Sequence, residues 1–231
     1  MATKKKTAEA QATEAQVVGF ELPKIDVRYL TVEVVGDSPL IVHKWSEKAK
    51  KEMLSKQMKQ ATNGKGAKDP EMDFYESLYW LNDMPVNKDG DIEKKDYEKA
   101  LKSGKARFGF PAIAFKACAI DAAFQQGVIA KKTGARGSFH LDDEFVEIIG
   151  TPQMREDMVM IGGISKVADI RYRGEFPEWR ATLNIKYNAK SITPEQILNM
   201  LNIGGFSNGV GEWRPSRDGL FGRFHVATQN D

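Results

Sequence analysis

The sequence predicts an α+β protein whose core elements follow the order β–α–β–β–α–β. Three observations support this order: an alternating strand near the start, a long apolar helix in the middle, and a strand–turn–strand followed by a helix and a last strand. The corresponding segments are 29–35, 111–128, 168–187, 193–202 and 220–227. This is the ferredoxin-like (RRM-like) arrangement. Two insertions are expected in it, a helical one at 44–104 and a loop with a β-hairpin at 129–162.

Each core element has its own local signal. In "YLTVEVV", residues 29–35, apolar and polar side chains alternate, which is typical of a half-buried strand. The stretch "AIAFKACAIDAAFQQGVI" has an apolar residue at nearly every helical turn, which predicts a helix with one buried stripe. The residues expected in this stripe are Ile113, Ala117, Ile120, Phe124 and Val128.

The second half of the core is predicted from a hairpin and a capped helix. In "ADIRYRGEFPEWRATLNIKYN" one face of the hairpin is apolar, whereas Arg171 and Arg173 lie on the other. In "SITPEQILNMLN", Thr193 is a good N-cap and Pro194 suits the first helical position.

Composition predicts a globular domain from residue 25 to 231, after a disordered basic arm at 1–24. The 34 Lys and Arg nearly balance the 32 Asp and Glu, so the overall charge does not favour nucleic acid. No apolar run is long enough for a membrane span. The single Cys118 excludes an internal disulfide and favours a reducing, cytoplasmic location. The one Cys and the three scattered His do not form the spacings of metal ligands, so no metal is expected, and no cofactor motif is present.

Basic residues are concentrated locally even though the total charge is small. Between Lys44 and Lys68 there are eight Lys against two Glu. Lys44, Lys48 and Lys51 fall on one stripe of a predicted helix. A solvated helix face and a phosphate-binding face explain such a stripe equally well.

The segment "IGGFSNGVGEWRPSRDGLFGRFHV", from Ile203, combines six glycines with Arg214, Arg217, Arg223 and Trp213. Glycine allows backbone N–H groups to approach a ligand closely, and successive N–H groups bind phosphate. Arginine would add charge and tryptophan a stacking surface. The segment lacks the spacing of an ATP-binding loop. The alternative is a long turn whose apolar side chains fill the core.

Three stretches resemble the RAMP superfamily, the RNA-binding proteins that build CRISPR effector complexes. The C-terminal glycine-rich loop resembles the one between the last helix and last strand of that superfamily. "VEVVGDSPLIVHK" is similar to its first strand, and "FPAIAFKACAIDAAF" to the start of its first helix, which carries a basic residue. The loop is also similar to phage and prophage proteins of this type, although "EWRPSRDG" lengthens it.

The resemblance implies sequence-independent binding of a single strand, RNA before DNA, by copies that associate head to tail with CRISPR-type subunits. Residues 129–138 would correspond to a thumb-like element. The residues expected to contact the strand are Lys44, Lys48, Lys51, Lys116, Lys131, Lys132, Arg136, Arg171, Arg173, Gly204, Gly205, Asn208, Gly209, Gly211, Trp213, Arg214, Arg217 and Arg223.

Two other functions remain open from the sequence. One is metal-independent RNA cleavage on the same fold, for which His43, next to Lys44, is the best general base among His43, His140 and His225. The other is a phage-encoded interaction protein that mimics a CRISPR subunit. We expect no enzymatic activity, because no catalytic arrangement of Ser, Cys, His and Asp is visible.

Overall fold

The computed structural model describes residues 24–59, 68–88, 90–162, 166–229 and 231. Apart from Lys24, the predicted basic arm lies outside the described residues. The helices are α1 (Glu47–Gln57), α2 (Pro70–Ser77), α3 (Lys94–Lys102), α4 (Ala112–Gln125), α5 (Lys132–Ser138) and α6 (Pro194–Ser207), with a 3-10 turn at Pro215–Arg217. The strands are β1 (Val27–Gly36), β2 (Leu40–Val42), β3 (Tyr79–Trp80), β4 (Phe108–Pro111), β5 (Phe139–Leu141), β6 (Phe145–Ile149), β7 (Gln153–Ile161), β8 (Val167–Phe176), β9 (Arg180–Asn188) and β10 (Phe224–Val226).

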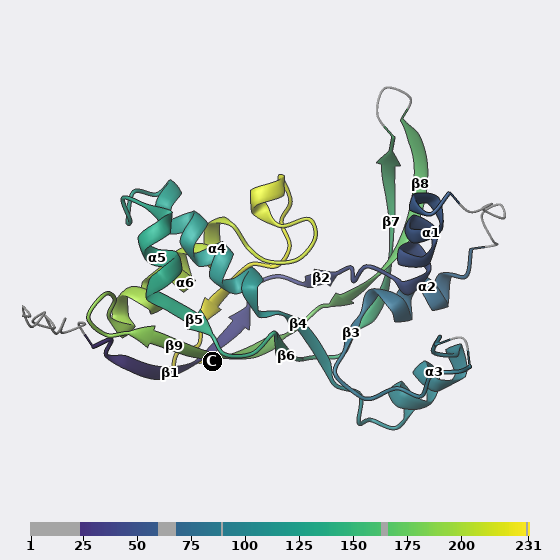
Figure 1. Ribbon diagram of the computed structural model, residues 1–231, viewed down its shortest axis with the longest axis horizontal. Coiled ribbons are helices and arrows are strands. Elements are labelled where there is room, and N and C mark those ends of the chain that lie inside the picture. Colours follow the sequence, from purple (N-terminus) through teal and green to yellow (C-terminus); the bar gives the residue numbers. More distant parts are fainter. Residues whose placement is uncertain (1–23, 60–67, 89, 163–165, 230) are drawn as a thin grey trace, which may run out of the picture.

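The larger sheet has seven strands in the order β10-β1-β9-β6-β4-β3, and β5 pairs with β9 next to β6. The paired strands are antiparallel. Helices α4, α5 and α6 lie on one face of this sheet (Figure 1). Strands β1, β5/β6, β9 and β10 with helices α4 and α6 form the predicted ferredoxin-like core, so the α+β fold class is confirmed.

A separate three-stranded sheet, in the order β2-β8-β7, projects away from the core as a long ribbon (Figure 1). Here the structure corrects the predicted hairpin at 168–187, because β8 pairs with β7 and β2 and only β9 belongs to the core sheet. The expected hairpin within 129–162 is also not formed, since β6 joins the large sheet and β7 the small one. Trp179, between β8 and β9, is buried, and its indole N–H donates to the Ser38 carbonyl. This contact fixes the place where the chain passes from the small sheet to the large one.

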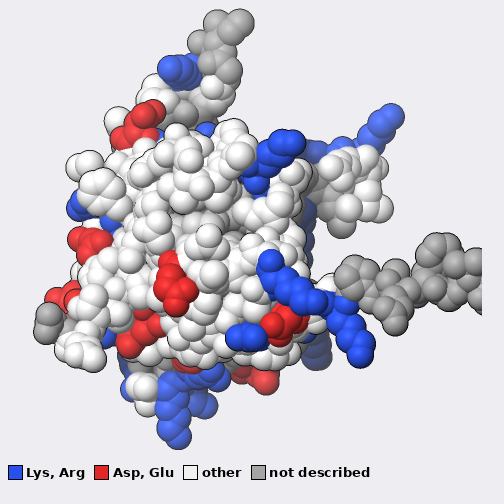
Figure 2. Space-filling view, turned by 90° about the vertical axis from the view of Figure 1, so that its left-hand side faces the viewer, with Lys and Arg blue, Asp and Glu red and all other residues white. Residues whose placement is uncertain are grey.

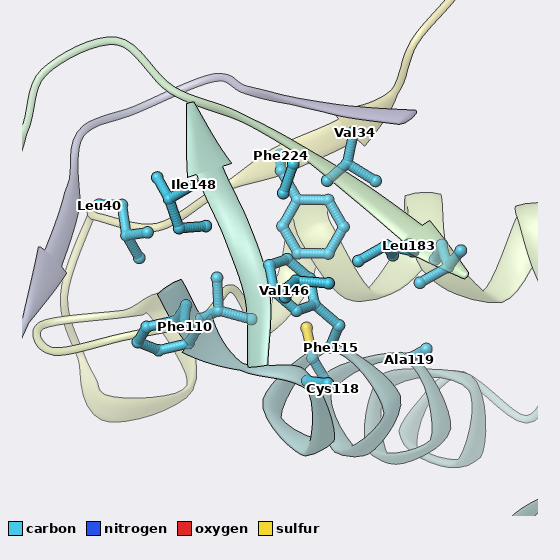
Figure 3. Packing of buried hydrophobic residues seen from close by; sticks show 14 of the residues in the cluster. Val34, Leu40, Phe110, Phe115, Cys118, Ala119, Val146, Ile148, Leu183 and Phe224 are labelled. Atoms are coloured by element: carbon cyan, nitrogen blue, oxygen red, sulfur yellow. The ribbon is translucent and has the colours of Figure 1, made fainter. Parts of the chain in front are cut away.

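The hydrophobic core lies between the large sheet and α4. Phe115, Cys118 and Ala119 point from α4 towards the sheet, where Leu183 and Phe224 receive them (Figure 3). The stripe predicted for this helix is confirmed only at Ile120, which is buried; Ile113, Phe124 and Val128 are 66%, 43% and 48% exposed. The helix is apolar almost all round, so its sequence does not show which side is buried; its small alanines allow the close approach of α6.

Helix α6 begins as predicted and ends later than predicted. Thr193 and Gln196 form a reciprocal capping box, and Pro194 occupies the first turn. The helix runs through Gly204 and Gly205 to Ser207. A Cβ on Gly204 would lie 2.9 Å from the Cα of Ala119, and one on Gly205 only 1.9 Å from the Phe224 carbonyl oxygen. These two glycines therefore permit close packing against α4 and β10.

The insertion at 44–104 is largely helical, as expected, and contains α1, α2 and α3. It also contributes β3, which extends the core sheet by pairing with β4. Asp69 caps α2 by accepting from the backbone N–H groups of Glu71 and Met72, and Pro70 follows it. Among the described residues, no helix combines the length and apolar character needed to cross a membrane.

Candidate functional site

The segment Asn208–Arg223 after α6 is a compact loop that bonds mainly to itself. The N–H of Val210 donates to the Gly222 carbonyl, and that of Phe221 donates to the Trp213 carbonyl. A Cβ on Gly219 would lie 1.7 Å from the Trp213 oxygen, and one on Gly222 would lie 1.7 Å from the Val210 oxygen. The glycines allow the chain to cross itself, and most of the loop amides have internal partners. Gly219 and Gly222 therefore serve the folding of the loop itself.

Trp213 attaches this loop to the three-stranded sheet. Its indole N–H lies 3.4 Å from a carboxylate oxygen of Asp157 on β7, and the guanidinium of Arg173 lies over the indole ring. Asp157 also binds Arg173 at 3.0 Å and Arg155 at 2.9 Å. Arg173 is only 4% exposed, so the structure gives it a partner inside the protein rather than an open surface for phosphate.

A cleft of about 420 Å³ lies between α4 and this loop. Two arginines that were predicted to bind the strand, Arg214 and Arg217, lie on its loop side. The other predicted residues at the cleft are Asn208, Gly209 and Gly211. The remaining lining residues were not predicted: Ile41, Tyr79, Phe110, Ala114, Ala117, Cys118, Asp121, Gln125, Val210, Glu212 and Ser216.

The two arginines of the cleft differ in how firmly they are held. The Nη1 of Arg214 donates to the Gly211 carbonyl at 2.8 Å, and its Nε donates to the Ser216 hydroxyl at 3.0 Å. Its guanidinium is therefore fixed in place, whereas Arg217 is exposed at the rim. Two guanidinium groups at one edge of a cleft are suited to binding phosphate oxygens.

Both acidic residues of the cleft have cationic partners elsewhere. Asp121 on α4 forms an ion pair of 2.8 Å with Lys132 of α5. Glu212 lies 3.9 Å from Arg173. These contacts offset the negative charge of the cleft, so that the charges of Arg214 and Arg217 are not cancelled by it.

His43 lies at the end of the cleft and also lines a second hollow of about 170 Å³. Lys44 and Arg171 line that second hollow, so three predicted residues meet there. Burial, and next the positive charge of Arg173, lower the pKa of His43 below its ordinary value. A neutral imidazole is therefore favoured at the end of the cleft.

The other predicted cations are dispersed over the molecule. Lys51 pairs with Asp91 at 2.6 Å, and the side chain of Lys48 is outside the described part of the structure. The expected thumb-like loop at 129–138 is mostly the helix α5, with Lys131 and Arg136 exposed. Figure 2 shows the end of the molecule where α5 and the start of β1 lie; Lys and Arg are separated there by Asp, Glu and broad uncharged surface.

Lys116, His225 and Arg223 also lie outside the cleft. Lys116 on α4 is 8% exposed, and its Nζ donates to the Arg136 carbonyl. His225 on β10 contacts Asp37 and Asp231. Arg223 is half-buried where the chain enters β10, and its backbone N–H donates to the Ser38 hydroxyl. The structure therefore gathers Arg214, Arg217 and His43 at the cleft, places Lys44 and Arg171 with His43 at the second hollow, and leaves the other predicted cations apart from them.

The fold and the cleft together describe a ferredoxin-like α+β protein with an arginine-edged cleft beside its first core helix. No protein-family model matches the sequence, and no curated protein is significantly similar to it. Among solved structures, the chain is similar to Cmr6 from Pyrococcus furiosus, with a TM-score of 0.42 and 9% sequence identity. The match covers 87% of this chain and 98% of that one. At this identity the likeness concerns the course of the chain alone.

Proposed function

We propose that this chain binds single-stranded nucleic acid, RNA in particular, along the cleft between α4 and the loop Asn208–Arg223. The observation that carries the proposal is the pair Arg214 and Arg217 at one edge of a cleft about 420 Å³ in volume. The resemblance of three sequence stretches to the RAMP superfamily supports the same function. In line with that resemblance, copies of the chain would associate head to tail along the strand, within a ribonucleoprotein of CRISPR type.

The contacts suit recognition of the backbone rather than of the base sequence. Arginine can bind phosphate oxygens through two N–H groups at once, and Arg214 is already oriented by Gly211 and Ser216. Lys44 lies beside His43 at the second hollow, which Asp73, Glu76 and Asp169 also line, and would add one further phosphate contact. If Arg214, Arg217 and Lys44 each neutralise one phosphate, a plot of the logarithm of the affinity against the logarithm of the salt concentration should have a slope of about −2.

Binding is measured by fluorescence anisotropy with a labelled twelve-nucleotide RNA at several salt concentrations. Arg217→Glu should weaken binding about tenfold and make the salt slope shallower, because one phosphate contact is replaced by repulsion. Lys102→Glu is the matched control, since it makes the same charge change on an exposed residue of α3. Equal affinities of the two variants, or no binding by the unaltered protein, would refute the proposal.

A second candidate function, metal-independent RNA cleavage, is favoured by the position and environment of His43. Its lowered pKa leaves the imidazole neutral and able to take the proton of a 2′-hydroxyl, whose oxygen would then attack the adjacent phosphorus and expel the 5′-oxygen, which takes a proton from water while the imidazolium returns its proton to the solvent. The expected products are a 2′,3′-cyclic phosphate and a 5′-hydroxyl end. Cleavage that is lost in His43→Ala while RNA binding persists would support this function; intact RNA after long incubation would exclude it.

A further inference from the structure

A further pocket, of about 360 Å³, opens beside the first turns of α4, on the side away from the cleft. Its walls are mainly apolar and aromatic, with Tyr79 and Phe145 at one side, their ring centroids 5.7 Å apart. Ile113, which is 66% exposed although apolar, lies at the opening. Tyr79 also lines the cleft, so the pocket adjoins the path proposed for the strand.

The polar groups of this pocket are a pair of donors and a pair of acceptors. The Nζ of Lys116 lies 3.2 Å from Nδ1 of His140 and also donates to the Arg136 carbonyl. An ammonium group only donates, so Nδ1 of His140 accepts and its Nε2 carries the hydrogen. Burial lowers the pKa of Lys116, as expected for a cation withdrawn from water. Asp143 and Glu144, on the β5–β6 connection, also line the pocket, and one oxygen of the Asp143 carboxylate accepts from Nδ2 of Asn184 at 3.3 Å.

We propose that this pocket receives one base of the strand bound in the cleft and favours a base that presents a carbonyl oxygen beside a ring N–H, namely uracil or guanine. The inference rests on the proposed function. The ammonium of Lys116 and the Nε2–H of His140 donate to the carbonyl oxygen. The carboxylates of Asp143 and Glu144 accept from the ring N–H, and the aromatic wall covers the face of the base.

Cytosine and adenine reverse this pattern, because an amino group replaces the carbonyl and an unprotonated ring nitrogen replaces the N–H. Their amino group would face the ammonium of Lys116, and their ring nitrogen would face a carboxylate. A donor facing a donor, or an acceptor facing an acceptor, leaves both groups unpaired once the base has displaced their water, which weakens binding. The pocket would therefore add base preference to a protein whose cleft contacts only the backbone.

The test compares labelled twelve-nucleotide strands of uridine and of cytidine, which differ at these two positions. The unaltered protein should bind the uridine strand about tenfold more tightly. His140→Ala and Lys116→Met should bring this ratio close to one, because each removes a donor that distinguishes the carbonyl of uracil from the amino group of cytosine. His225→Ala, a histidine substitution on the distant strand β10, should keep the full ratio. Should Lys116→Met fail to fold, His140→Ala decides, because His140 is exposed.

The possible outcomes separate this inference from the proposed function. Strong binding of both strands with a ratio near one refutes the base pocket and leaves backbone binding in the cleft intact. A tenfold ratio that persists in His140→Ala also refutes the pocket, because the preference then arises elsewhere. If neither strand binds, the proposed function fails, and the base pocket fails with it. A purely structural role for Lys116 would change stability but not the ratio.

Discussion

Replacing Gly205 by alanine tests whether the glycine pair of α6 serves packing. The new Cβ would lie 1.9 Å from the Phe224 carbonyl oxygen and 2.8 Å from its Cδ2, so β10 must move away from α6. That movement disturbs the pairing of β10 with β1. Overpacking of this kind costs about 3 kcal/mol, and the better helix propensity of alanine returns about 1 kcal/mol. The free energy of unfolding should fall by about 2 kcal/mol.

For a chain of this size, such a loss lowers Tm by roughly 4–8 °C, which calorimetry or circular dichroism detects readily. Gly134→Ala is the control, because it lies within α5 with no atom within 4 Å of the added Cβ. The control should be neutral or slightly stabilising. A Gly205→Ala protein that melts like the unaltered one but binds RNA poorly would refute the packing role and favour direct phosphate contact.

Three further predictions concern buried or paired groups. Asp157→Ala removes the carboxylate that holds Arg173, whose side chain is 5% exposed, and should lower the free energy of unfolding in urea by about 3 kcal/mol; a loss below about 1 kcal/mol would contradict this. Burial alone would lower the pKa of His225, but the hydrogen bonds that its ring N–H groups donate to the carboxylates of Asp37 and Asp231 outweigh burial and raise the pKa above 6.5. The stability that protonated His225 contributes is complete below the pKa of the unfolded chain and is lost as the pH rises through the pKa of the folded protein. An NMR titration of His225 should therefore give a pKa above 6.5, and this pKa should be lower in Asp37→Asn. Burial raises the pKa of the Cys118 thiol to about 12, so a thiol reagent should label it slowly at neutral pH although it lines the cleft, and rapidly after unfolding; labelling of the native protein as fast as that of the unfolded chain would contradict this.

The order of the core elements could be predicted from local patterns except for the second core strand, which is β5/β6 and not the first strand of the predicted hairpin. Alternation identified strands within 29–35 and 168–187, and Thr193 with Pro194 marked the start of α6. The partner of each strand could not be predicted in the same way, since alternation is the same for any neighbour. The chain therefore leaves the small sheet at Phe176 and enters the large one at Arg180 without a signal in the pattern.

The candidate site was predictable where its residues are close in sequence. Arg214, Arg217 and Asn208 meet because one loop carries them. Tyr79 reaches the cleft only because the two-residue strand β3 pairs with β4, and no local pattern indicates that pairing. The glycines were misleading for a physical reason: the same residue type permits close approach to a ligand or to another part of the chain, and only the contacts distinguish them.

Photochemical cross-linking of a strand that contains 4-thiouridine, followed by mass spectrometry, tests nucleic-acid binding in the cleft most directly. If the strand occupies the cleft, cross-links should form with peptides of α4 and of the loop around Arg214, and they should become weaker in Arg217→Glu. Cross-links confined to other surfaces, or none at concentrations where the strand binds, would contradict the proposed function.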